Sequence, residues 1–327
     1  MDARLTDRFG RHIEYLRVSV TDRCDLRCQY CLPDGFRGFE VPDHWLSFDE
    51  ITRVVAAFAR CGVKRIRLTG GEPLARKDLP ALAARLGDVA GVEDLSLSTN
   101  ATRLARHAEA LRQAGVSRLN VSLDSLQSER FAAITRGKLS KVLSGLMAAK
   151  AAGFRPIKIN MVLMAGVNDD EVEDMVEFCI EHDFTLRFIE TMPVGETGRD
   201  ASHHYVDLQQ VRQRLERRFT LLPGVMPGGG PARYVRVAGT RLRIGFITPL
   251  SQHFCATCNR VRLTVDGTLL LCLGQDDSLA LRPLLRAGIG ERELEQAITD
   301  AIALKPERHE FRDKPEQVLR FMSMTGG

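Results

Sequence analysis

Short apolar runs rich in β-branched residues alternate, as far as Met192, with longer segments in which apolar residues recur every three or four positions. The short runs predict strands, and the longer segments predict amphipathic helices. The expected strands are Leu16–Val20, Arg65–Thr69, Asp94–Thr99, Arg118–Leu123, Pro156–Leu163 and Thr185–Ile189. A regular alternation of strand and helix is typical of a parallel sheet.

The strongest helix pattern covers Ser47–Arg60, where Ser47 stands three residues before Glu50, the spacing of a capping box. Further helices are expected over Thr102–Gln113, Lys141–Ala151 and Glu171–Glu181. A glycine just before the next strand predicts the end of a helix. Glycines in this position are Gly62, Gly115 and Gly153.

Two parallel architectures compete for this pattern, an open doubly wound sheet and a barrel. No Gly-x-Gly-x-x-Gly motif follows the first strand, so the dinucleotide-binding form of the open sheet lacks its signature. Residues of functional type follow several strands directly, as they do in barrels. Six repeats are fewer than the eight of a closed barrel. We therefore expect an α/β fold built on a partial, open βα barrel of six repeats.

The pattern changes after Met192, which predicts a first domain over residues 1–192 and a C-terminal module over residues 193–327. In the second part, Ser202–Arg218 has helical character and Pro223–Pro231 has the composition of a linker. Two hairpins should follow, with turns at Ala238-Gly239 and Asp266-Gly267.

Composition narrows the class of protein. The formal net charge of the 327-residue chain is only +4, which argues against a nucleic-acid partner. No apolar run is long enough to span a bilayer, and the N-terminus lacks the apolar core of a signal peptide. We therefore expect a cytoplasmic protein without a membrane partner. Thiols stay reduced in that compartment, so the 8 cysteines indicate metal binding or catalysis.

Six of the cysteines form two triads near opposite ends of the chain. The first triad, directly after the first expected strand, is Cys24, Cys28 and Cys31. The second triad, which the second hairpin should bring together, is Cys255, Cys258 and Cys272. Structural zinc takes four protein ligands, and simple electron-transfer clusters usually take four cysteines. Three thiolates leave one position open for a ligand, so both triads predict reactive sites.

The first triad has CxxxCxxC spacing with Tyr30 before its last cysteine, and Thr69-Gly70-Gly71-Glu72-Pro73 ends the second strand. Together these motifs resemble the radical S-adenosylmethionine (SAM) superfamily. The resemblance implies a 4Fe-4S cluster whose open iron chelates SAM and whose electron releases a 5′-deoxyadenosyl radical. It also implies that SAM contacts Tyr30, Gly71, Ser122 and Met192. For Met192, packing in the core is a competing explanation.

The second triad alone fits a zinc knuckle completed by His253 as well as it fits a cluster. Longer segments, however, are similar to the GTP 3′,8-cyclase family of molybdenum cofactor biosynthesis. These segments are 15–24, 64–73, 120–124, 187–192, 254–262 and the terminal Gly326-Gly327. The similarity covers essentially the whole chain.

This resemblance implies a radical SAM lyase with two 4Fe-4S clusters that converts GTP into 3′,8-cyclo-7,8-dihydro-GTP. The radical would take the ribose 3′-hydrogen, and the open iron of the second cluster would bind guanine. The implied GTP contacts are Arg17, Arg67, Thr99, Lys158, Arg260 and Arg262. The implied partners are an electron donor and a cyclic pyranopterin monophosphate synthase that takes the product. The sequence leaves the oligomeric state open, a homodimer included.

Elementary chemistry agrees with an anionic substrate. Arg67 and Lys158 lie inside expected strands, where burial without a partner is costly. Arg260 and Arg262 are two positions apart, so on a strand both face one side. The diglycine end is either a frayed terminus or, as the resemblance implies, a tail that completes the active site. Two alternatives stay open, another radical SAM enzyme with an auxiliary cluster, such as a peptide-modifying one, and a zinc-stabilised binding module.

Overall fold

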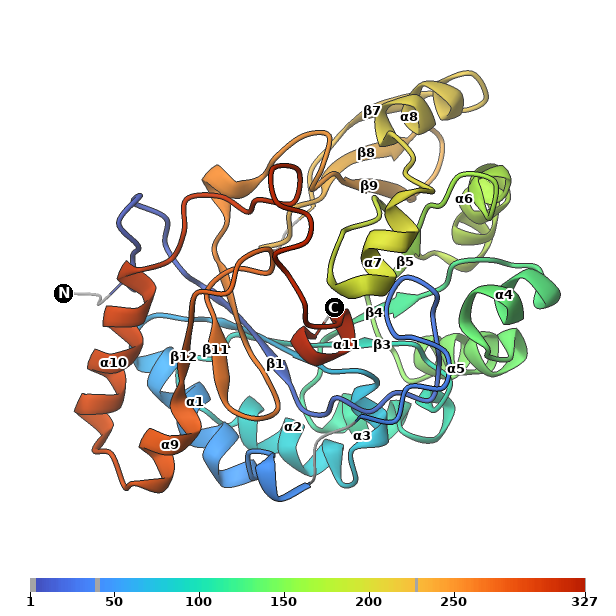
Figure 1. Ribbon diagram of the computed structural model, residues 1–327. Coiled ribbons are helices and arrows are strands. Elements are labelled where there is room, and N and C mark those ends of the chain that lie inside the picture. Colours follow the sequence, from blue (N-terminus) through green and yellow to red (C-terminus); the bar gives the residue numbers. More distant parts are fainter. Residues whose placement is uncertain (1–3, 39–41, 227–228, 327) are drawn as a thin grey trace.

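The computed structural model describes residues 4–38, 42–226 and 229–326. Its centre is one sheet of 12 strands in the order β12-β11-β10-β1-β2-β3-β4-β5-β6-β9-β8-β7, and within the described residues the two ends do not pair (Figure 1). The strands are β1 Tyr15–Ser19, β2 Arg65–Thr69, β3 Asp94–Thr99, β4 Arg118–Ser122, β5 Ile157–Val162, β6 Thr185–Ile189, β7 Leu221–Gly224, β8 Arg233–Val237, β9 Arg243–Ile247, β10 Arg260–Leu263, β11 Thr268–Leu270 and β12 Ser278–Ala280.

All six expected strands are present, and neighbours from β1 to β6 pair in parallel. The open α/β barrel of six repeats is therefore confirmed. Two strands from the C-terminal part extend it, because β10 pairs in parallel with β1 and β9 pairs in parallel with β6. The sequence did not indicate these two pairings. The domain boundary at Met192 stays a prediction, since one sheet runs through both parts.

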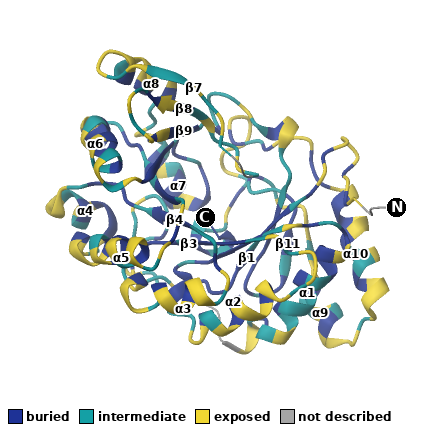
Figure 2. Cartoon of the chain, turned by 180° about the vertical axis from the view of Figure 1, so that it is seen from behind, coloured by how far each residue is buried: buried dark blue, intermediate teal, exposed yellow. Residues whose placement is uncertain are grey.

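Helices cover the outer face of the sheet and present their exposed residues to solvent (Figure 2). The helices of the structure are α1 Phe48–Arg60, α2 Leu79–Gly87, α3 Ala108–Gln113, α4 Ser128–Thr135, α5 Leu139–Ala151, α6 Val172–His182, α7 Gly195–Ser202, α8 Leu208–Glu216, α9 Leu281–Arg286, α10 Glu291–Ala303 and α11 Met322–Thr325. The last of them, α11, lies at the centre of the sheet rather than on its outer face (Figure 1). Among the described residues, no helix is both long and apolar enough to cross a membrane.

The capping box before α1 is confirmed, because the Glu50 amide donates to Ser47 Oγ over 3.1 Å and the Ser47 amide donates to the Glu50 carboxylate over 2.7 Å. The glycine stops are confirmed as well. Gly62, Gly115 and Gly153 have φ values of 92°, 87° and 80°, which glycine adopts without steric cost.

Three expectations needed correction. The helix expected over Ser202–Arg218 is broken, since α7 ends at Ser202 and the Asp207 carboxylate caps α8 by accepting the Gln209 amide over 2.8 Å. The helix expected over Thr102–Gln113 is interrupted at His107, between a 3₁₀ turn, Leu104–Arg106, and α3. The linker expected over Pro223–Pro231 starts inside β7. A proline is tolerated there because β7 is an edge strand, which within the described residues pairs only with β8.

Both expected hairpins are confirmed. The strands β8 and β9 pair in antiparallel fashion around the turn at Ala238-Gly239, and β10 and β11 pair likewise around Asp266-Gly267. In each hairpin one strand also joins the parallel barrel, which brings the second cysteine triad next to β1. The chain then returns across the sheet, and the C-terminus lies at its centre beside α11 (Figure 1).

Candidate functional site

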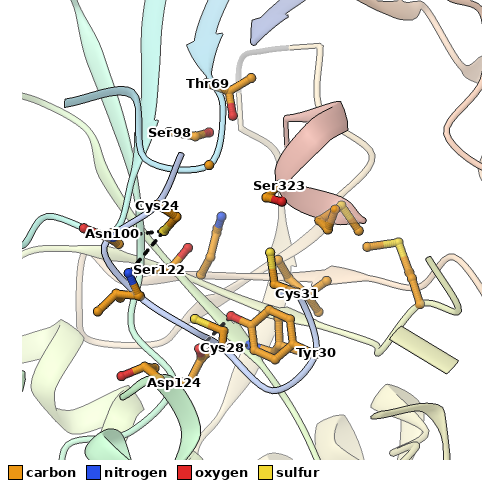
Figure 3. A pocket seen from close by; sticks show the side chains of 18 of the residues that line it. Cys24, Cys28, Tyr30, Cys31, Thr69, Ser98, Asn100, Ser122, Asp124 and Ser323 are labelled. Atoms are coloured by element: carbon orange, nitrogen blue, oxygen red, sulfur yellow. Dashed lines mark hydrogen bonds between the residues drawn. The ribbon is translucent and has the colours of Figure 1, made fainter. Parts of the chain in front are cut away.

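A cavity, called here the first chamber, opens at the carboxyl ends of the parallel strands (Figure 3). The first triad lies on one wall, on the loop after β1. The opposite walls are the strand ends and the C-terminal helix α11. The lining includes Tyr30, Gly70, Gly71, Ser122, Asp124, Met192, Met322 and Ser323. All four residues expected to contact SAM therefore line one chamber with the three cysteines.

The glycine pair after β2 is required by the backbone of the cysteine loop. A Cβ on Gly70 would lie 2.4 Å from the Thr21 carbonyl oxygen, and a Cβ on Gly71 would lie 2.5 Å from that of Arg23. The Gly71 amide donates to the Thr21 carbonyl over 2.8 Å, which draws the two loops together. The absent side chains thus let the cysteine loop pack directly onto the end of β2.

The thiols of the first triad are buried enough to resist ionisation. Burial raises the pKa of Cys24 and of Cys31 to about 12, and it raises the pKa of Cys28 well above its usual range. Three such thiols on one wall become good ligands only when a bound cation compensates the thiolate charge. The donor set therefore fits an iron–sulfur cluster held by three cysteines.

Tyr30 is fixed by a residue that sequence analysis missed. Its hydroxyl donates to the Asp124 carboxylate over 2.7 Å, and the Val162 amide donates to the same carboxylate over 2.9 Å. Figure 3 shows Tyr30 and Asp124 beside Cys28. Burial raises the pKa of Asp124 to about 6. Asp124 thus ties the cysteine loop to the ends of β4 and β5.

Glu72 faces away from the chamber that its neighbours Gly70 and Gly71 line. Its carboxylate accepts the Thr99 hydroxyl over 2.8 Å, the Asn100 amide over 2.7 Å and the Leu74 amide over 3.0 Å. Burial raises the pKa of Glu72 to about 7. The acid of the glycine motif therefore joins the ends of β2 and β3.

A second chamber is lined by the other cysteine triad, Cys255, Cys258 and Cys272. Burial alone would raise the pKa of the Cys258 thiol, but Lys305 and Arg260 outweigh it and lower that pKa. The Lys305 ammonium is buried and donates to the Leu271 carbonyl. Three thiols beside these cations fit a thiolate-bound cluster, as at the first triad.

The two chambers adjoin, since several residues line both. The shared wall consists of Arg17, Ser98, Asn160, Ile189, Met192, Arg262 and Leu273. Arg17 and Arg262 are direct register partners on β1 and β10. A ligand held between the triads would therefore contact both arginines.

Cations are concentrated around the second chamber without matching acids. Burial and neighbouring arginines lower the pKa of Arg17 well below its usual range, and burial lowers the pKa of Arg187 and of Arg262 to about 10. No carboxylate among the described residues offsets these shifts. Arg17 Nε and Arg187 Nε also lack hydrogen-bond partners within the described residues. Burying so much uncompensated charge is costly, and an anionic ligand would offset it.

Two of the expected GTP contacts lie apart from this chamber. Thr99 lines the first chamber, where its hydroxyl is bonded to Glu72. Lys158 lies in a third cavity, called here the basal pocket, which also contains Arg67 and Arg187. Those two arginines line the second chamber as well, so the basal pocket continues from it. Arg260 lines the second chamber, as expected.

The C-terminal tail ends at the shared wall. Arg262 donates to the Gly326 carbonyl and, over 3.4 Å, to the Thr325 carbonyl. Gly326 has a φ of 71°, and a Cβ there would lie 2.3 Å from Thr69 Cγ2. The tail is thus packed against β2 and β10, and only glycine fits this position. Gly327, the other glycine expected in the site, lies outside the described residues.

Glu190, also missed from sequence, connects the two sites. It follows β6, lines the first chamber and is fully buried. Its carboxylate accepts the Leu250 amide over 2.8 Å, the Ser251 amide over 3.1 Å and the hydroxyls of Ser251 and Tyr205. Residues 250–251 lead directly into the second triad. Position at a strand end was the available signal for both Asp124 and Glu190, but it does not reveal which backbone amides such an acid holds.

Comparison with known proteins places these features in a family. Residues 18–179 match the family model of the Radical SAM superfamily, and residues 184–311 match the model Molybdenum Cofactor Synthesis C. GTP 3′,8-cyclase of Ectopseudomonas mendocina is 52% identical over 99% of both chains. GTP 3′,8-cyclase 2 of Pseudomonas aeruginosa is 51% identical over 100% of this chain and 99% of its own.

Solved structures support the fold. SuiB of Streptococcus suis, in its crystal structure bound to S-adenosylmethionine, superposes with a TM-score of 0.62. The alignment covers 87% of this chain and 67% of SuiB at 15% identity. Identity at that level shows a common fold only.

Proposed function

The chain belongs to the GTP 3′,8-cyclase family of radical SAM enzymes, and we propose that its adjoining chambers bind SAM and GTP side by side for the conversion of GTP into 3′,8-cyclo-7,8-dihydro-GTP. Family membership implies a 4Fe-4S cluster and SAM as cofactors. The observation that carries the proposal is the wall common to both chambers, since residues that line both would lie against both ligands.

The first chamber would hold SAM. Cys24, Cys28 and Cys31 would bind the first cluster, which together with SAM supplies a 5′-deoxyadenosyl radical. The residues expected to contact SAM, Tyr30, Gly71, Ser122 and Met192, line this chamber and would surround it. Apolar lining from Ile189, Leu273 and Met322 would keep water away from the reacting atoms.

The second chamber would hold GTP. Cys255, Cys258 and Cys272 would bind a second 4Fe-4S cluster, next to which the guanine would lie. Arg17, Arg260 and Arg262 offer donors for the ribose and phosphates, because guanidinium groups bind phosphate oxygens in pairs. Arg67 and Lys158 extend this positive charge into the basal pocket, which suits the terminal phosphates of a triphosphate. Thr99 lines the first chamber, where its hydroxyl is hydrogen-bonded to Glu72. From there it would approach GTP at the ribose.

The tail would complete the shared wall. Arg262 is bonded to the Gly326 carbonyl, so the tail holds one phosphate-binding arginine in place. Gly326 and Gly327 are therefore proposed as catalytic-site residues. We further propose that the enzyme works in the cytoplasm, with an electron donor and a downstream cyclic pyranopterin monophosphate synthase as partners, and that residues 193–327 act as the module that brings the second cluster.

Another radical SAM activity, on a peptide, is the competing function, because SuiB has this fold and has also been solved "bound to precursor peptide SuiA". The distribution of charge argues against it. A peptide channel does not require a buried group of cations without acids, whereas a triphosphate does.

Single cysteine variants test the assignment of the two triads. Cys24→Ala removes a ligand of the first cluster and should abolish cleavage of SAM. Cys258→Ala should leave slow, uncoupled SAM cleavage but abolish cyclisation of GTP. Both products are measured by mass spectrometry after anaerobic reconstitution with iron and sulfide. Cyclisation of GTP at the wild-type rate by Cys258→Ala would refute the two-cluster proposal.

A further inference from the structure

A second group of metal-binding side chains overlaps the second triad. His253, Cys255 and His309 each offer one ligand atom, and these three atoms lie within 4.8 Å of one another. Neither Cys258 nor Cys272 belongs to this group. We infer that these three residues form a mononuclear site for a divalent ion of the zinc class, which shares Cys255 with the proposed cluster site and excludes the cluster when it is filled.

His309 provides the strongest evidence. Its side chain is 6% exposed and lines the second chamber, yet neither ring nitrogen makes a hydrogen bond within the described residues. A buried imidazole without partners is costly unless a ligand satisfies it. The Pro249 carbonyl lies near the ring, although not in hydrogen-bonding geometry. A metal-bound histidine commonly donates its second ring N–H to such a carbonyl.

The positions of His309 and Cys255 are fixed by a common anchor. Arg11, which is buried and paired with Asp7 over 2.5 Å, donates to the Cys255 carbonyl over 3.0 Å. It also donates to the carbonyls of Pro306 and Glu307, each over 2.6 Å, just before His309. One guanidinium therefore holds the two segments that carry these ligands, so the site is organised before an ion arrives.

His253 supplies the side that faces solvent. It is exposed, and its ring centroid lies 5.1 Å from that of His309. An ion could therefore be taken up from solution through His253 and passed to the buried pair. The ring of His309 is in turn supported by Phe311, whose centroid is 4.5 Å away.

The donor set selects the ion. Zinc prefers tetrahedral coordination by imidazole nitrogen and thiolate sulfur, with bonds of about 2.0–2.3 Å. Two imidazoles and one thiolate leave a fourth position for water, and binding releases the Cys255 thiol proton to solvent. Zinc also binds such ligands more tightly than Fe²⁺ does. Since Cys255 belongs to both ligand sets, the supply of zinc relative to iron would decide which centre forms.

Cobalt titration separates the two ligand sets. The full-length chain carries Cys24→Ala, Cys28→Ala and Cys31→Ala, so that only the second region binds metal, and Co²⁺ is added without oxygen to the iron-free protein. We expect about one tetrahedral, thiolate-bound Co²⁺ per chain by absorption. His309→Ala should weaken binding about 10–100-fold, as loss of a ligand does. Cys272→Ala, the matched control, should bind Co²⁺ as before yet no longer assemble the second cluster.

The opposite pattern would overturn the inference. If Cys272→Ala loses Co²⁺ while His309→Ala keeps it, the ion binds to the three thiols alone. Absence of tight Co²⁺ binding to the parent protein would overturn it as well. If His309→Ala fails to fold by circular dichroism, His253→Ala replaces it, since the side chain of His253 is exposed and does not pack in the core. Failure here leaves the proposed cyclase function intact, because that is tested on the cluster-loaded wild type.

Discussion

Buried cations are the residues that define this site most sharply. Charged side chains at strand positions, such as Arg67 on β2 and Lys158 on β5, are 8% and 5% exposed. A position inside an expected strand was enough to single them out from sequence, because a charge buried there is costly unless a partner or ligand compensates it. That Arg67 lines both the second chamber and the basal pocket, whereas Lys158 lines only the latter of the two, could not be predicted, since it depends on how strands far apart in sequence pair.

The amino group of Lys158 should make GTP binding depend on pH. Burial, reinforced by Arg187 and Arg118, lowers the pKa of Lys158 to about 7. Bound phosphate favours the ammonium form, so above pH 7 binding must take up a proton. GTP affinity should therefore fall as pH rises from about 7 to 9, by up to about tenfold per pH unit. Below its pKa, Lys158 is charged in the free and in the GTP-bound enzyme, so it does not make GTP affinity depend on pH there.

Calorimetry with GTP at several pH values measures this slope. In Lys158→Met the affinity should be lower at pH 7 and nearly flat between pH 7 and 9. An equally steep slope in wild type and Lys158→Met would place the titrating group elsewhere.

At the level of elements, local sequence patterns predicted more of the first part than of the second. The strands Arg65–Thr69, Asp94–Thr99 and Thr185–Ile189 have the expected bounds, because each carries apolar residues at alternate positions, the local pattern of a strand. The parallel pairing of β9 and β10 with the barrel edges has no local signal, since it joins segments far apart in sequence. The roles of Asp124 and Glu190 depend on the same long-range arrangement.

Glu190 should control whether the two sites work together. Glu190→Ala leaves the half-buried amides of Leu250 and Ser251 without this acceptor, at a cost of roughly 1 kcal/mol each. The loop before Cys255 should loosen, so iron at the second triad should fall. More 5′-deoxyadenosine should then form per molecule of cyclised GTP. Iron analysis and mass spectrometry of both products measure the change.

Tyr205→Phe is the matched control for this variant. It removes only the hydroxyl that donates to Glu190 over 3.1 Å, and three donors remain. Its iron content and product ratio should stay close to wild type. If Glu190→Ala forms 5′-deoxyadenosine and cyclised GTP in the wild-type ratio, the role of Glu190 is only structural.

At the scale of the whole molecule, the chain closes on itself. The first strand, the last parallel strand and the tail meet at Arg17, Arg262 and Gly326. The tail is anchored along its length, since Arg320 pairs with Asp276 over 2.8 Å and the ring centroids of Phe321 and Phe36 are 5.3 Å apart. The terminus is therefore positioned by contacts that do not include its last two residues.

Deleting Gly326 and Gly327 should consequently separate folding from function. The helix α11 keeps its buried Ser323 and Thr325, so the melting temperature and the iron content should hardly change. Product formation should collapse, because Arg262 loses the Gly326 carbonyl and the shared wall is incomplete. A diglycine-ended peptide added in trans should restore part of the activity. A truncated chain that turns over GTP at the full rate would contradict a catalytic role for the tail.

The most direct test of the account follows one hydrogen atom between the two chambers. The reconstituted wild-type enzyme is incubated with SAM, dithionite and GTP deuterated at the ribose 3′ position, and both products are identified by mass spectrometry. We expect 3′,8-cyclo-7,8-dihydro-GTP together with 5′-deoxyadenosine that has gained the deuterium, since the two ligands share one wall. Release of 5′-deoxyadenosine without deuterium, and with GTP unchanged, would contradict it.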